Sequence, residues 1–181
     1  MHIFHKRQGQ MYNELLYFYT ITIYEFKHLL KDDAYKIVCI NALKHLVDNK
    51  LIKIYGYVIM PNHIHLIWTM LEYNGKESVA ASFAKFTADA FKKILLQQNP
   101  LVLEAYKSPK HDRAYQFWKG DPLAVPSTTE DVFYQKLDYI HNNPIMDKWK
   151  LAATPESYRW SSAGFYAGLN DEFGLLSYFK A

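Results

Sequence analysis

Residues 51–70 read LIKIYGYVIMPNHIHLIWTM. Both halves of this segment are rich in β-branched and aromatic residues, which favour strands, and Pro61-Asn62 between them favours a turn. We therefore predict two strands, Leu51–Met60 and His63–Met70, that pair as an antiparallel hairpin. Because side chains alternate between the two faces of a strand, the two histidines of the second strand project to the same side of the sheet.

The segments around this hairpin complete a pattern of strands and helices. Apolar spacing predicts the following order: a strand at Leu15–Tyr24, a helix at Asp32–Asn49, the hairpin, a helix at Ser78–Gln97, a strand at Tyr115–Lys119 and a helix from Ser127 to about Asn143. The second helix has an apolar face that includes Phe83 and Phe86. Ser127 and Glu130 form a capping box for the last helix, and Pro144 ends it. The order predicts an α+β fold, a ferredoxin-like βαββαβ antiparallel sheet with an added C-terminal helix.

The composition fits one packed domain. The chain has 181 residues, of which 50% are hydrophobic and 17% aromatic, so it can bury a sizeable core and is not generally disordered. We expect a single domain over residues 1–181, with a core at about 15–146 and a C-terminal tail, 147–181, packed on it.

Cysteine content, charge and hydropathy limit the classes of site, partner and cellular location that we expect for the protein. The single cysteine excludes a disulfide framework and a thiolate zinc cluster. The net charge of +3 gives weak support for a nucleic-acid partner. No apolar run reaches the roughly 18 residues of a membrane-spanning helix, and residues 1–10 lack the apolar core of a signal peptide. We expect a soluble protein inside the cell, with no membrane partner.

His63 and His65 are the first candidates for chemistry. They lie about 7 Å apart along the predicted strand and on the same face, so their imidazoles could converge on one divalent ion. The rigid strand would fix them before the ion arrives, which lowers the ordering cost of binding it. Two histidines on a solvated sheet face explain the same spacing, and the motif by itself leaves both interpretations open.

The end of the last predicted helix holds the second candidates. Tyr139 and Asn143 are four residues apart and share a helical face, while Phe133, Leu137 and Ile140 form an apolar face towards the core. This geometry could bring a phenol and an amide oxygen beside the same metal ion. The alternative is an ordinary amphipathic tyrosine and an asparagine of the kind that is common near helix ends.

Together these groups suit an attack on a phosphodiester. A free tyrosine has a pKa near 10, so little of it is phenolate at neutral pH. A divalent ion on a non-bridging oxygen withdraws negative charge and orients the phosphorus. Attack by the tyrosine then leaves a covalent phosphotyrosine and expels a sugar hydroxyl. Two nitrogen ligands and one oxygen ligand accept Mg²⁺ or Mn²⁺, and Mn²⁺ is the easier fit for imidazoles.

Three separate motifs resemble those of one family. Tyr57–Ile67 resembles the HUH motif (His-hydrophobic-His) of single-tyrosine transposases. Tyr139–Pro144 resembles the Y-I-H-x-N-P motif of their REP-associated branch, and Trp160-Ser161-Ser162 resembles its W-S-S. Over roughly residues 15–166, the chain is similar to REP-associated tyrosine transposases of the IS200-like group. It departs from them after the Asn-Pro pair, where residues 145–149 contain no glycine.

This resemblance implies a metal-dependent enzyme of DNA transposition that nicks and rejoins single-stranded DNA beside hairpins or palindromic repeats. Tyr139, on the added C-terminal helix, takes the place of the catalytic nucleophile, which forms a 5′-phosphotyrosine and leaves a 3′-hydroxyl. His63, His65 and Asn143 take the places of the metal ligands, with Mg²⁺ or Mn²⁺ as the cofactor. The implied partner is single-stranded or hairpin DNA in the bacterial cytoplasm, at the nucleoid. Some relatives are dimers that exchange their tyrosine helices, so a homodimer stays open beside a monomer.

Basic residues are candidates for DNA phosphate contacts. They are Lys85, Lys92 and Lys93 on the second predicted helix, Arg113 in the loop after it, and Lys136 one turn before Tyr139. A plain solvated surface explains each of them equally well. Two further functions remain open: a domesticated hairpin-binding protein that does not cut DNA, and a metal-dependent phosphoesterase that uses water. We assign no role to His141, because on a helix it points away from Tyr139.

Overall fold

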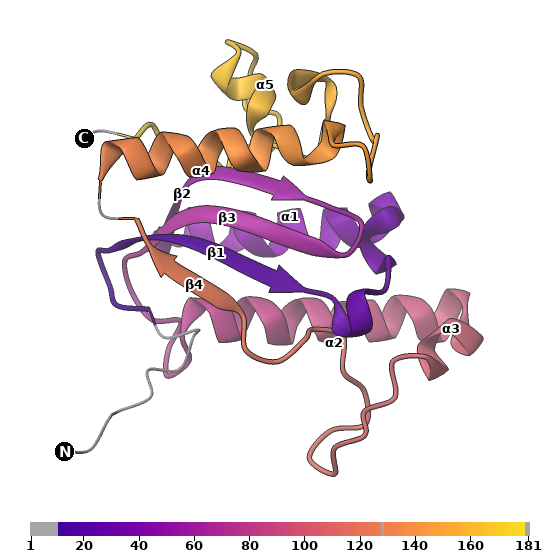
Figure 1. Cartoon of the computed structure of the whole chain (residues 1–181). Helices are drawn as coiled ribbons and strands as arrows, with labels where there is room; N and C mark the ends of the chain where they lie inside the picture. Colours follow the sequence, from indigo (N-terminus) through magenta and orange to yellow (C-terminus); the bar gives the residue numbers. More distant parts are fainter. Residues whose placement is uncertain (1–10, 128, 180–181) are drawn as a thin grey trace, which may run out of the picture.

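The computed structural model describes residues 11–127 and 129–179 (Figure 1). Its strands and helices are β1 (Leu16–Thr22), α1 (Asp33–Asp48), β2 (Ile52–Ile59), β3 (His63–Met70), α2 (Val79–Gln98), α3 (Pro100–Glu104), β4 (Leu123–Pro126), α4 (Glu130–Asn142) and α5 (Ala163–Tyr166). Residues 1–10, for which we predict no signal peptide, lie outside the described residues. In the described part, none of the helices combines the length and the apolar character required to cross a bilayer.

The strands form one antiparallel sheet in the order β2-β3-β1-β4. With α1 after β1 and α2 after β3, this is the βαββαβ arrangement, so the predicted ferredoxin-like α+β fold is confirmed. The predicted hairpin is confirmed as well, because β2 and β3 pair directly and β3 begins at His63. In the pairing of β1 with β3, Thr20 lies opposite His65 and Thr22 lies opposite His63.

The two faces of the sheet are covered by different helices (Figure 1). On one face, Tyr19 of β1 packs against Trp68 of β3, with 5.0 Å between ring centroids. Tyr19 also lines a surface hollow together with Ala84 of α2, and α1 packs against α2. Helix α4 contacts β2 and β3 on the other face. We call these the α1–α2 face and the α4 face.

Gly56 of β2 lets α4 come close to the sheet. A Cβ atom at this position would lie 2.7 Å from Leu137 Cδ1 and 3.2 Å from Ile140 Cδ1, so the side chains of α4 would have to move. Phe133, Leu137 and Ile140 are buried, and the predicted core-facing stripe of this helix is therefore confirmed. Tyr139 lies on the exposed side of the same helix.

The predicted fourth strand, at Tyr115–Lys119, is wrong. The strand lies at Leu123–Pro126 and pairs with β1, whereas residues 115–119 form only single bridges. Phe117 and Trp118 are adjacent and both buried against Phe91 of α2, which the alternating side chains of a half-buried strand cannot achieve. The actual strand is short, largely exposed and bounded by prolines, so it carries little strand signal in the sequence.

Two details of the helices also differ from the prediction. Helix α4 is capped by Thr129, whose side chain accepts a hydrogen bond from the Val132 amide, rather than by Ser127. On α2, Phe86 is 57% exposed. The buried side chains of α2 are Val79, Phe83, Thr87, Phe91 and Leu95. Thr87 was hidden from an apolar count because it is polar, yet its hydroxyl accepts a hydrogen bond from the buried indole of Trp118.

The C-terminal segment runs along the outer edge of β2. Trp160 accepts a hydrogen bond through its carbonyl from the Ile59 amide at 2.8 Å, and the Ser162 amide donates to the Tyr57 carbonyl at 2.9 Å. The W-S-S motif thus pairs with an edge strand whose backbone groups would otherwise lack these partners.

Candidate functional site

His63 and His65 lie on the α4 face of β3, with their ring centroids 4.6 Å apart. His63 Nδ1 donates to Asn62 Oδ1 across 2.6 Å, and His65 Nδ1 lies 2.7 Å from Thr20 Oγ1. With Nδ1 engaged on both rings, Nε2 is the nitrogen that remains for another partner. Within the described residues, His65 Nε2 is buried and has no hydrogen-bond partner.

Both imidazoles are held uncharged at neutral pH. Burial, with a smaller effect from the nearby Lys148 ammonium, lowers the pKa of His63 to about 4. Burial, with smaller effects from neighbouring positive charges, lowers the pKa of His65 to about 3. A neutral imidazole keeps a lone pair, so both rings can act as metal ligands without first losing a proton.

Tyr139 of α4 lies beside this pair. Its ring centroid is 5.5 Å from that of His65 and 6.1 Å from that of Phe18, which itself stacks on His65 at 5.2 Å. Tyr139 is 49% exposed, so a large substrate can reach its phenol. The rings belong to one chain, so they meet without any exchange of helices between two copies.

Asn143 follows the last residue of α4. It begins the 3₁₀ turn Asn143–Ile145, one helical turn beyond Tyr139, and it is only 3% exposed. In the part of the chain that the structure describes, its side-chain amide makes no hydrogen bond. Its oxygen is therefore available to a ligand.

The available donors fit a divalent ion of the hard or borderline kind. In residues 11–127 and 129–179, no three His, Cys, Asp or Glu side chains gather into a metal site. A metal held here would take imidazole nitrogens from His63 and His65 and an amide oxygen from Asn143, which leaves positions for water or phosphate. The unpartnered His65 Nε2 is the kind of atom that such a site would employ.

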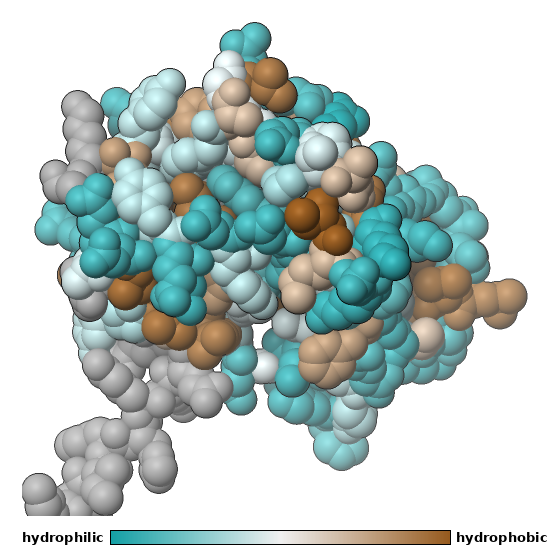
Figure 2. All heavy atoms as spheres, turned by 45° about the horizontal axis from the view of Figure 1, so that its top comes forward, coloured by the Kyte–Doolittle hydropathy of each residue, from teal (hydrophilic) through white to brown (hydrophobic). Residues whose placement is uncertain are grey.

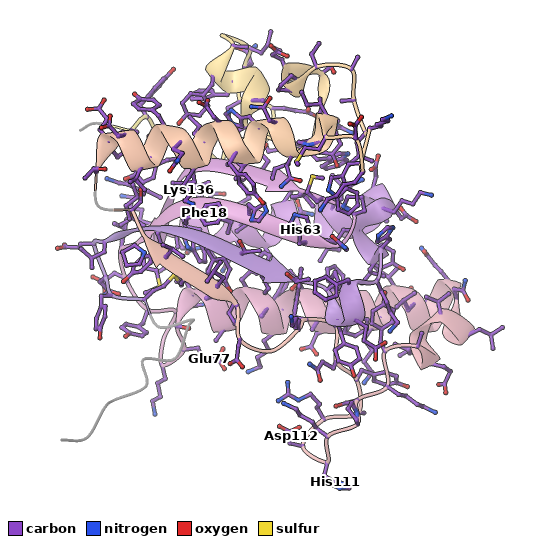
Figure 3. The ribbon with its side chains drawn as sticks, in the orientation of Figure 1. Phe18, His63, Glu77, His111, Asp112 and Lys136 are labelled. Carbon is purple, nitrogen blue, oxygen red and sulfur yellow. The ribbon has the colours of Figure 1, made fainter. Side chains whose placement is uncertain are left out.

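Two lysines surround the histidines with positive charge. Lys136 Nζ lies 5.1 Å from the centre of the Phe18 ring, and Lys148 Nζ lies 5.2 Å from the centre of the Trp149 ring. Figure 3 shows Lys136 and Phe18 together between α4 and the sheet. The surface on the side of α4 and the C-terminal segment is mainly hydrophilic, with small and separate hydrophobic patches (Figure 2).

Lys85 and Arg113, two of the predicted DNA contacts, lie away from the histidines. Lys85 forms an ion pair with Glu77 at 3.0 Å, and Arg113 forms one with Asp112 at 2.8 Å. In Figure 3, Glu77 and Asp112 both lie below α2, whereas His63 lies above α2, at the sheet. Their charges are also partly neutralised by these acidic partners.

Lys92 and Lys93 lie on α2, which covers the opposite face of the sheet from Tyr139. Lys92 Nζ is 5.4 Å from the centre of the Tyr115 ring, and Lys93 is exposed. Of the five basic residues predicted to contact DNA, the structure brings only Lys136 to the histidines.

His141, to which the sequence analysis assigns no role, anchors the tyrosine helix. Its Nε2 lies 2.8 Å from Ser162 Oγ, which also accepts a hydrogen bond from the Tyr57 amide at 2.9 Å. Burial lowers the pKa of His141 to about 4. Ser162 of the W-S-S motif therefore links α4 to β2, two residues along the helix from Tyr139. In the sequence, the only hint of this contact is that the motif at Tyr139–Pro144 and the W-S-S motif occur in the same chain. Neither motif predicts the hydrogen bond between His141 and Ser162.

Comparisons with known proteins concern the fold. A solved structure of a REP-associated tyrosine transposase bound to a REP hairpin matches with a TM-score of 0.61 over 100% of both chains, at 14% identity. A candidate transposase from Deinococcus radiodurans matches with a TM-score of 0.39 over 76% of this chain and 95% of that chain, at 20% identity. No protein-family profile and no curated protein matches the chain. The chain thus shares its fold with a REP-associated tyrosine transposase.

Proposed function

We propose that the chain is a single-tyrosine DNA strand transferase of the REP-associated, IS200-like type, which nicks and rejoins single-stranded DNA beside a hairpin. The observation that carries the proposal is the meeting of a phenol and two neutral imidazoles from separate elements. The Tyr139 ring lies 5.5 Å from His65, whose ring lies 4.6 Å from His63. A hairpin substrate is supported by the solved structure of similar fold, which is bound to a REP hairpin.

Tyr139 is the nucleophile in this proposal. Its Oη forms a bond to phosphorus while the bond from phosphorus to the sugar 3′ oxygen breaks. The phenol proton passes to water, and the leaving oxygen takes up a proton, so the products are a 5′-phosphotyrosine and a 3′-hydroxyl. The link between Tyr139 and the DNA is itself a phosphodiester, so the energy of the broken bond is retained. A second 3′-hydroxyl can therefore attack this link, release Tyr139 and rejoin the strand.

His63, His65 and Asn143 would hold a Mg²⁺ or Mn²⁺ ion. When bound, such an ion withdraws charge from the scissile phosphate and orients it. Asn62 and Thr20 engage Nδ1 of the two imidazole rings, so Nε2 is the nitrogen of each ring that remains for the ion. Because phenol, imidazoles and amide come from one chain, the proposed site is complete in a monomer.

Covalent trapping tests the proposal. The protein is incubated with Mn²⁺ and an end-labelled DNA hairpin that carries unpaired flanks, and the mixture is then denatured. Wild type should yield a covalent protein–DNA adduct, and Tyr139→Phe should reduce it by at least ~10³-fold because the nucleophilic oxygen is gone. Tyr134→Phe is a matched control, since Tyr134 lies on the same helix and is 48% exposed. This control should form the adduct normally.

Two other results would contradict the proposal. Hairpin binding by wild type without any cleavage would indicate a DNA-binding protein. Cleavage without an adduct, unchanged in Tyr139→Phe, would indicate a phosphoesterase that uses water as the nucleophile.

A further inference from the structure

We infer that Lys148 and Trp149 form a nucleotide-binding edge of the site, in which the ammonium binds a backbone phosphate and the indole stacks on an unpaired base next to the cut. This inference rests on the proposed DNA-cutting function. It concerns the segment after the Asn-Pro pair, where the chain departs from the related transposases. Neither residue carries a motif that would single it out in the sequence.

The indole ring of Trp149 lies beside His63. Its ring centroid lies 6.0 Å from that of His63 and 5.7 Å from that of His28. Its Nε1 is buried and has no acceptor among the residues that the structure describes. The indole is thus embedded by its nitrogen edge, while Lys148 Nζ lies 5.2 Å from the ring centre. Because Lys148 is exposed, the part of the indole that it covers borders solvent.

Lys148 is available to an anion. Within residues 11–127 and 129–179 it has no acidic partner, whereas Lys150, two residues on, pairs with Asp147 at 3.4 Å. Its Nζ lies 5.2 Å from the centre of the Trp149 ring, and that ring centroid lies 6.0 Å from the His63 ring centroid. A phosphate bound near His63 would therefore lie within the field of this ammonium.

The other histidine has a similar arrangement on its far side. Phe18 stacks on His65 at 5.2 Å, and Lys136 Nζ lies 5.1 Å from the centre of the Phe18 ring. Each histidine thus has an aromatic ring against it, and each ring carries an ammonium. The two rings differ in exposure, because Phe18 is only 5% exposed whereas Trp149 is partly exposed. Base stacking is therefore expected at Trp149, with Lys136 serving as a phosphate contact alone.

Salt-dependent binding of DNA tests the inference. The probe is a fluorescein-labelled DNA hairpin with an unpaired extension of mixed sequence, and affinity is measured by anisotropy in the Tyr139→Phe background, which forms no adduct. Lys148→Ala should weaken binding and reduce the slope of log K against log salt by about 0.7, the value for one phosphate contact on a single strand. Lys150→Ala is the matched control on the same loop and should leave that slope unchanged.

Trp149 is tested with the same probe. Trp149→Ala should weaken binding by roughly 5- to 150-fold, the range for loss of one stacked base, while Trp149→Phe should retain most of the affinity. The loss should vanish on a blunt hairpin, which offers no unpaired base. The urea midpoint of each variant shows whether it is folded.

The results separate this inference from the proposed function. Equal salt slopes for Lys148→Ala and Lys150→Ala, or equal losses on extended and blunt hairpins in Trp149→Ala, would overturn the inference even if wild type forms the adduct. A reduced slope and an extension-specific loss, in a protein whose wild type never forms the adduct, would keep the nucleotide-binding edge and reject strand transfer. Absence of any DNA binding would overturn both.

Discussion

The two faces of strand β3 carry different types of side chain, although these side chains alternate along the same eight residues. On the α1–α2 face, Ile64, Leu66 and Trp68 are fully buried. On the α4 face, the strand begins with His63 and His65, whose Nδ1 atoms hydrogen-bond to Asn62 and Thr20, and the His65 ring lies beside Tyr139 of α4. One strand therefore packs the core with one face and presents polar groups with the other.

Side chains that stabilise the fold and side chains suited to chemistry therefore alternate along one strand. Each large apolar side chain buried on the α1–α2 face contributes about 1.5–3 kcal/mol. Buried polar atoms without partners cost free energy instead. The four such side-chain atoms in the described part of the chain include His65 Nε2 and Trp149 Nε1, both at the candidate site. A metal ion would give His65 Nε2 a partner, whereas the indole nitrogen of Trp68 is an unpartnered atom of the α1–α2 face.

The largest effect should come from breaking the packed face. Trp68→Ala removes a fully buried side chain and should lower the free energy of unfolding by about 3–5 kcal/mol. Urea denaturation measures this loss. The fraction that remains folded should still form the tyrosine adduct, because Trp68 points away from the histidines. If Trp68→Ala does not fold, the milder Ile64→Val, which should cost about 0.5–1.5 kcal/mol, tests the same separation.

The opposite pattern is expected from Thr20→Val on the α4 face. Removal of the hydroxyl that holds His65 Nδ1 should weaken Mn²⁺ binding by roughly 10–100-fold with little change in stability. Isothermal titration with Mn²⁺ measures the affinity. Thr22→Val, opposite His63 on the same strand, is the matched control, since Thr22 makes no side-chain hydrogen bond to either ring. Equal affinities for the two variants would show that the hydroxyl does not position the imidazole.

A pH dependence should follow from His141, the anchor of α4. Burial lowers the pKa of His141 to about 4, so the unfolded chain binds a proton below about pH 6.5 while the folded chain does not until about pH 4. Stability should therefore fall as the pH falls through this window. In metal-free buffer, His141→Gln should lose about 2 kcal/mol less than wild type between about pH 7 and pH 5. Parallel urea curves for the two proteins would exclude this assignment.

The smallest effect should come from Lys150, in the turn after α4. Its φ of 45° lies in the left-handed region, which favours glycine. Lys150→Gly should raise the free energy of unfolding by up to about 1 kcal/mol, since the strain of an L side chain disappears. Lys150→Ala keeps that strain and should give no gain in the same urea measurement.

Much of the fold could be predicted because its elements carry strong periodic signals. The hairpin, β1 and the three long helices follow from apolar spacing, and β3 begins at the predicted residue, His63. The fourth strand could not be predicted, since its edge position exposes its side chains and removes the apolar pattern. Phe117 and Trp118 suggested a strand because aromatic residues favour strands, but they are buried by contacts with α2.

The order of the amino acids is enough to place two imidazoles on one face of a strand, and a phenol and an amide on one face of a helix. These are consequences of local backbone periods, which need no knowledge of the rest of the chain. The tertiary fold brings the strand and the helix together, with 5.5 Å between the ring centroids of Tyr139 and His65. It also decided the neutral state of the imidazoles and the place of Lys148 and Trp149 beside them. Burial and contact between distant residues depend on how all the side chains pack together, which no local pattern encodes.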